Sequence, residues 1–302
     1  EVLFLLILAI GAYLVPFFAR LLRLPTAVAE ILFGVSLSAM GVHSSSSGPV
    51  AFLSELGFVF LMYLAGMEIE WGLLRARGRG ELILLFSFYL AMMPLALMLP
   101  AHLGLPPVGG VLLILTAVGL LFPVLKEANL LHQPLGQNLL LLGTVGEVVS
   151  LLVFTLFGLW ARFGWSLQSI RHLGQILVFA LAAALIRRCF FWITWWFPAL
   201  LRPFAQFRDD AVQLGMRGTL VIVLLFVGMA GLLGLEPIVG AFLGGAIFGG
   251  LLHQKERIKS SVGGMAYGFL VPIFFMEVGM KLPLHLLGSW NIWQTALLLS
   301  GG

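Results

Sequence analysis

Long, almost entirely apolar segments run through the whole chain and limit its fold more than any other feature. A helix that crosses the ~30 Å hydrocarbon core of a bilayer needs about 20 apolar residues. Because the segments are continuously apolar and do not alternate, they predict membrane-spanning helices and exclude a barrel. We count ten spans and the start of an eleventh, near residues 3–22, 26–41, 51–69, 82–102, 108–125, 136–160, 172–199, 214–234, 237–252, 264–282 and 288–302.

Composition excludes a water-soluble domain. Hydrophobic residues make up 61% of the chain and charged residues 10%, whereas soluble domains carry about 45–50% and about 25%. The single cysteine, Cys189, excludes an intrachain disulfide, and no Cys/His spacing is typical of zinc. No Ser/His or Asp/Asp group shares one membrane depth, so we expect neither an enzyme nor a bound cofactor.

Basic residues lie mostly on one side of the predicted spans. By our count 14 of the 17 Lys and Arg residues fall on the side reached at the end of the first span. The positive-inside rule makes that side cytoplasmic and places the N-terminus outside. We therefore expect an integral protein of a prokaryotic inner membrane, in which the excess of positive charge is a topology signal and not a nucleic-acid footprint.

Two pairs of short segments suggest an internal repeat. Residues 25–34 align with residues 236–245, and residues 65–69 align with residues 278–282. The members of each pair are offset by seven spans, an odd number, so the two copies would run in opposite directions, as in many secondary transporters. The alternative is that small-residue motifs recur in any packed membrane helices. We predict a first repeat over 1–160, a linker helix over 161–212 and an incomplete second repeat over 213–302.

Glu147 is the clearest candidate for a functional residue. It lies 11 residues after Gly136, near the middle of a predicted span. An ionisable residue at that depth is costly and usually functional. A desolvated carboxyl can hold a proton or a small cation, and competition for one site is enough to exchange the two across a membrane. The alternative is a protonated glutamate bonded to a neighbouring helix.

Helix breakers interrupt the fifth predicted span, which contains Gly119 and Pro123. Backbone carbonyls freed inside a span are tolerated where they line a cavity or bind an ion. The hydroxyl of Thr116 adds an oxygen ligand at that depth. The alternative is an ordinary proline-kinked helix in which Thr116 bonds to its own backbone.

Two further acidic residues lie inside predicted spans. Glu277 precedes Lys281 by four residues, so the two either neutralise each other or act in gating or proton transfer. Glu30 lies about one turn inside its span, and we interpret it as a lining or packing residue.

Five segments, in order across residues 24–280, resemble the monovalent cation:proton antiporters, in the branch of bacterial sodium/proton and potassium/proton exchangers. They begin at Leu24, Leu53, Thr116, Gly234 and Gly268.

The resemblance implies an all-α inverted-repeat fold of thirteen helices with a broken core helix, of which about eleven are present. It also implies a homodimer with a core and a dimerisation domain. By position Thr116 resembles the broken-helix threonine or serine of the family, and Glu147 resembles its ion-binding aspartate. We expect five supporting residues, which are Gly146, Ser150, Gly119, Glu277 and Lys281. The family has an acidic or amide residue before its carboxylate, where this chain has Gly146.

We therefore predict a transporter in the lipid bilayer that exchanges sodium or potassium for protons by alternating access at Glu147. Two alternatives remain. One is a sodium-coupled symporter of organic anions on the same architecture. The other is a membrane scaffold or sensor that has lost transport together with the acidic pair.

Overall fold

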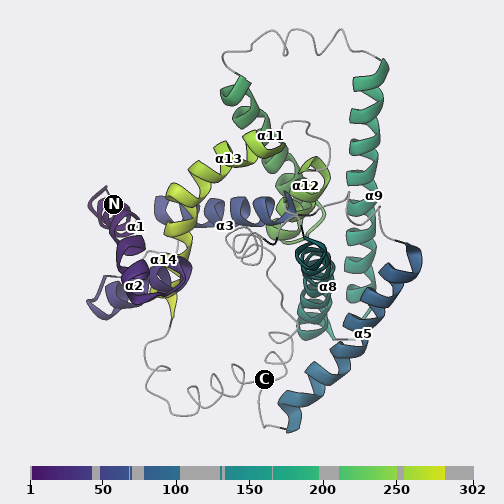
Figure 1. Ribbon diagram of the computed structural model, residues 1–302, viewed down its shortest axis with the longest axis horizontal. Helices are drawn as coiled ribbons and strands as arrows, with labels where there is room; N and C mark the ends of the chain where they lie inside the picture. Colours follow the sequence, from purple (N-terminus) through teal and green to yellow (C-terminus); the bar gives the residue numbers. More distant parts are fainter. Residues whose placement is uncertain are drawn as a thin grey trace. The chain divides into compact units, whose positions relative to one another are not determined.

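The computed structural model describes residues 2–42, 48–67, 69, 78–102, 130, 133–164, 166–196, 211–249 and 255–282. All regular secondary structure in these ranges is helical, which confirms the predicted all-α class. The helices are shown in Figure 1. They are α1 (Val2–Leu22), α2 (Thr26–Ala39), α3 (Pro49–Met67), α5 (Arg79–His102), α8 (Pro134–Phe163), α9 (Leu167–Trp196), α11 (Ala211–Leu232), α12 (Pro237–Gly249), α13 (Lys255–Met265), η1 (Ala266–Leu270) and α14 (Val271–Lys281).

Each predicted span that falls on described residues corresponds to a helix. In the described part of the chain, four helices are long and apolar enough to cross a membrane, over residues 2–22, 49–67, 170–189 and 259–281. Four shorter apolar helices accompany them. The predicted spans over 108–125 and 288–302 lie outside the described residues.

The last described span begins earlier than predicted. We expected it to start at residue 264, but helix continues from Lys255 through η1 to Lys281. The five residues of η1 form a π-helix directly before Pro272. Proline has no N–H and its ring collides with the carbonyl four residues earlier, and a π-turn is a common way to absorb that defect. The polar segment that begins at Lys255 therefore joins the apolar span as one helical run.

The chain divides into two compact units. One comprises residues 1–66 and 179–292, and the other comprises residues 67–178 and 293–302. The first unit thus combines helices from both predicted repeats, α1 to α3 with α11 to α14. The predicted division into repeats concerns sequence order, and it stays a prediction.

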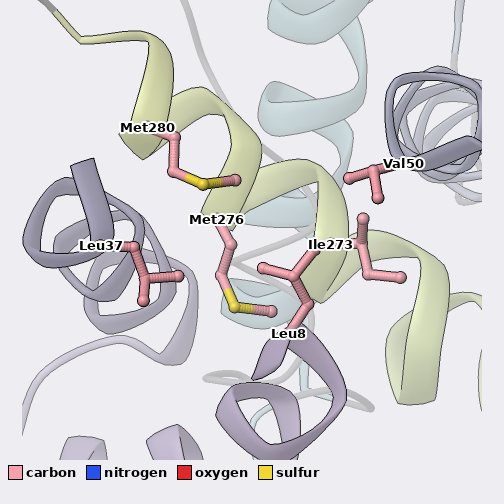
Figure 2. Close-up of a cluster of buried hydrophobic side chains, with 6 residues drawn as sticks. All are labelled: Leu8, Leu37, Val50, Ile273, Met276 and Met280. Carbon is pink, nitrogen blue, oxygen red and sulfur yellow. The ribbon is translucent and has the colours of Figure 1, made fainter. Parts of the chain in front are cut away.

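The core of the first unit lies where α14 packs against α1 and α2. Figure 2 shows six buried apolar side chains gathered there. Met276 and Ile273 of α14 are fully buried, as is Leu8 of α1. Because lipid tails are as apolar as these side chains, the cluster holds α14 between the two N-terminal helices through close van der Waals packing and not through removal from water.

Glycines on both helices allow α2 and α14 to touch through their backbones. A Cβ atom on Gly34 would overlap the carbonyl oxygen of Met276. A Cβ on Gly279 would overlap the carbonyl oxygen of Ile31 and lie 3.0 Å from the amide nitrogen of Val35. Small residues on both sides are how membrane helices reach such short separations.

The same contact recurs between α3 and α12. A Cβ on Gly66 would overlap the carbonyl oxygen of Phe242 and lie 2.8 Å from the amide nitrogen of Ala246. In the alignment that pairs residues 25–34 with 236–245 and 65–69 with 278–282, Gly66 matches Gly279. The residues contacted by the two glycines match as well, because Ile31 pairs with Phe242 and Val35 with Ala246. Gly66 and Gly279 therefore contact matching backbone atoms in the two crossings.

A third close approach joins α3 to the end of η1. A Cβ on Gly57 would overlap the carbonyl oxygen of Leu270, and these two positions correspond when the pairing of residues 65–69 with 278–282 is extended toward the N-terminus at the same offset. Next to this contact the rings of Phe58 and Phe274 stack, with centroids 4.6 Å apart and planes inclined by 6°. Two equivalent residues in mutual contact are what an approximate twofold axis between two copies produces.

Candidate functional site

Helix α8 carries the acidic candidate Glu147. The backbone of Glu147 lies near the middle of this 30-residue helix, which runs from Pro134 to Phe163. Gly146, directly before it, is buried, and so is Ser150, one turn later, with 2% of its surface exposed. The structure thus places Glu147 between two buried positions of a helix long enough to cross a bilayer.

A hydrogen bond from a neighbouring helix reaches α8 one turn before this position. The hydroxyl of Tyr89 on α5 donates to the carbonyl oxygen of Leu142, at 2.9 Å. Within an α-helix the same carbonyl accepts the N–H of the residue four positions later, which here is Gly146. Tyr89 is therefore tied to the turn that leads into Glu147. We did not predict this contact, because a tyrosine in an apolar span carries no sequence signal for its partner.

Replacement of Tyr89 by Phe is expected to lower the free energy of unfolding by about 1 kcal/mol, the usual worth of a single hydrogen bond. The amide of Gly146 should also exchange its hydrogen faster, since loss of the tie between α5 and α8 makes local opening of this turn easier. Thermal unfolding in detergent and residue-resolved hydrogen exchange measure the two effects.

Tyr13→Phe is the matched control for this prediction. Tyr13 is 69% exposed on α1, so the loss of its hydroxyl should change neither quantity. An unchanged amide exchange rate at Gly146 in Tyr89→Phe would show that the bond does not constrain α8.

Thr116 and Gly119, the other members of the predicted ion site, lie outside the described residues. In the described part of the chain, no three His, Cys, Asp or Glu side chains lie close enough together to hold a metal ion.

Glu277 and Lys281 form an ion pair. Lys281 Nζ lies 2.8 Å from Glu277 Oε1, and the two residues are one turn apart on α14. The Glu277 side chain is 2% exposed and the Lys281 side chain 60% exposed. Apart from Lys281, Glu277 Oε1 has no hydrogen-bond donor among the described residues. The pairing that the spacing suggested is thus formed, while a role of the pair in gating or proton transfer stays a prediction.

Lys281→Met is expected to lower the free energy of unfolding by about 1–3 kcal/mol, because it leaves a buried carboxylate without its partner. The double variant Glu277→Gln, Lys281→Met should recover most of that loss, since it removes the uncompensated charge. Thermal unfolding of the single and double variants measures the difference. Equal losses of unfolding free energy in the single and double variants would mean that water around Glu277 already compensates its charge.

Glu30 is buried more deeply than its sequence position indicated. It is 4% exposed and lies on the same face of α2 as Gly34, Leu37 and Ser38, which are also buried. Gly34 contacts α14, so this is the face that α2 turns toward that helix. The sequence showed an acid near a helix end, and only the packing of α14 shows that it is enclosed.

Comparison with known proteins identifies the family. The model of the sodium/hydrogen exchanger transmembrane region matches residues 5–301, nearly the whole chain. The chain belongs to the sodium/hydrogen exchanger family.

Relatives within this exchanger family come from bacteria and archaea. The chain is 27% identical to the putative Na⁺/H⁺ antiporter YjbQ of Bacillus subtilis over 98% of its length, and it covers 49% of that relative. It is 23% identical to the probable Na⁺/H⁺ antiporter 3 of Methanocaldococcus jannaschii, again over 98% of its length and 74% of the relative. The chain thus spans about half the length of YjbQ and about three quarters of the archaeal protein.

A solved structure of this exchanger family shares the fold. The sodium proton antiporter MjNhaP1 from Methanocaldococcus jannaschii superposes with a TM-score of 0.58 and 17% sequence identity, over 99% of this chain and 74% of that one. The predicted antiporter-like fold class is therefore confirmed.

Proposed function

We propose that the protein to which this chain belongs exchanges sodium for protons across a membrane, with Glu147 as the carboxylate that both ions share. The observation that carries the proposal is an acidic residue at the middle of the 30-residue helix α8, in a chain that the exchanger family matches over residues 5–301. A carboxylate between apolar turns is costly unless it binds a proton, a cation or another partner.

The proposed exchange follows from competition at one group. When Glu147 is protonated the cation has no counter-charge, and when the cation binds the proton must leave. Access from alternate sides of the membrane then moves the two ions in opposite directions. We assign the remaining oxygen ligands to the Thr116 hydroxyl and nearby carbonyls. Exchange of potassium in place of sodium is a variant of the same proposal. We also propose that the protein assembles into a homodimer.

The matching backbone contacts support alternating access by two inverted halves. Gly279 meets α2 as Gly66 meets α12, through the same pair of backbone atoms. Two copies of one packing unit with opposite direction can exchange conformations, and that exchange would open a site between them to either side in turn.

Transport measurement tests the proposal directly. The complete protein is reconstituted in vesicles with a pH gradient, and sodium, potassium or lithium is added outside. Gradient dissipation that depends on sodium supports the exchanger. No response to any cation would contradict it.

A membrane scaffold or sensor is the second candidate. It is favoured by Gly146, which stands where the resemblance to cation:proton antiporters implies a second acidic or amide side chain before the carboxylate. Binding without transport distinguishes this candidate, because a sensor would bind sodium in equilibrium measurements and still leave the pH gradient intact.

A further inference from the structure

The crossing of α2 and α14 contains two buried acidic residues outside the proposed ion site. Glu30 directly precedes Ile31, whose carbonyl lies against Gly279. Glu277 directly follows Met276, whose carbonyl lies against Gly34. Glu30 is 4% exposed and Glu277 is 1% exposed. Both carboxyls are therefore within one helical turn of a backbone contact that admits no side chain.

The equivalent crossing of α3 and α12 shows that packing alone does not call for these acids. In the alignment of the two copies, Glu30 matches Ala241 and Glu277 matches Leu64. Ala241 is 0% exposed and Leu64 is 1% exposed. Apolar residues thus occupy the matching positions of the α3–α12 crossing. Close packing of α2 against α14 therefore does not require the two carboxyls.

The two acids differ in their partners. Glu277 is held by Lys281 on its own helix. The ionisable residues on the helices packed against α2 are Tyr13 and Arg20 on α1, and Glu277 and Lys281 on α14. Among the described residues, none of these four forms an ion pair or hydrogen bond with Glu30. Within the same part of the chain Glu30 is a buried carboxyl that lacks a compensating charge.

An uncompensated carboxylate inside a protein costs several kcal/mol, so the closed crossing accommodates Glu30 in its neutral form. The ionised form needs water around it. Glu30 is 4% exposed while α2 and α14 are in contact, so the closed crossing leaves little room for water around its side chain. Loss of the proton is therefore linked to separation of α2 from α14.

We propose that Glu30 is a second proton-binding site of this protein, which holds its proton while α2 and α14 are in contact and releases it when they separate. The site belongs to the first compact unit and does not depend on Glu147. Its ligand is the proton itself, and Glu277, which pairs with Lys281, takes no part in it.

Infrared spectroscopy of the complete protein in lipid nanodiscs tests the site. The Glu147→Gln background removes the carboxyl of the proposed ion site, so that failure of the exchanger proposal leaves this test intact. We expect a band from a protonated carboxyl in an apolar setting that is present in acid and disappears in base. The band should be absent in Glu30→Gln and in Glu30→Ala, the residue that the second crossing uses at the matching position.

Hydrogen exchange of α2 provides the link to helix separation. We compare the backbone amide hydrogens of residues 26–39 in the parent and in Glu30→Gln at the same pH. The two proteins should exchange them at the same rate in acid, and the parent should exchange them at least tenfold faster in base. Glu55→Gln, an exposed acid of α3, should behave as the parent. A Glu30 band that persists at every pH, its absence at every pH, or equal exchange in Glu30→Gln and the parent would each overturn the proposal.

Discussion

Replacement of Glu147 by Gln is expected to abolish sodium-dependent dissipation of a pH gradient in vesicles that contain the complete protein. Gln keeps the size of the side chain and most of its polarity, but it neither ionises nor balances a bound cation. Because the proposed mechanism moves both ions through this one carboxyl, we expect the rate to fall at least a thousandfold, which corresponds to a loss of about 4 kcal/mol.

Glu55→Gln is the matched control for the loss of transport. Glu55 is also an acidic residue in an apolar helix, but it is exposed on α3, and its replacement should leave the rate within about twofold. Glu147→Asp keeps the charge and shortens the side chain by one methylene, so it should retain transport with a changed affinity for sodium. Full transport by Glu147→Gln would contradict the assignment of the carboxylate.

Gly34→Ala is expected to give one of the largest losses of stability for a single added methyl group, about 3 kcal/mol. The new Cβ would overlap the carbonyl oxygen of Met276. An obstructing side chain could rotate away, but the backbone carbonyl of a helix cannot. The helices α2 and α14 must therefore move apart along their whole contact. The shift should appear as a lowered unfolding temperature in detergent and a lowered yield of monodisperse protein.

Gly231→Ala on α11 is the matched control, because a Cβ at that position meets no atom within 4 Å. Ala is the better helix former by roughly 0.5–1 kcal/mol, so this variant should be as stable as the parent or slightly more stable. Gly66→Ala should behave like Gly34→Ala, since it would overlap the carbonyl oxygen of Phe242 in the equivalent crossing. Equal unfolding temperatures for Gly34→Ala and Gly231→Ala would show that the two helices are not in contact.

The sequence by itself determined the helices and the position of the main acidic candidate along its helix. Length and apolarity are local properties, so the bounds of α1, α3 and α8 follow from counting residues against the thickness of a bilayer. The central position of Glu147 follows from the same count. The alignment of residues 65–69 with 278–282 also came from the sequence, and it paired Gly66 with Gly279, which the structure places against matching backbone atoms.

Only the tertiary structure decided which face of each helix is buried. In a soluble helix the polar face marks the outside, but α2 is apolar on nearly all sides, so its sequence pattern does not separate the protein side from the lipid side. The enclosure of Glu30 and the bond from Tyr89 to Leu142 both depend on helices that are distant in sequence. The ion pair of Glu277 and Lys281 was predictable because its four-residue spacing is local, whereas the burial of Glu277 is produced by the neighbours of α14.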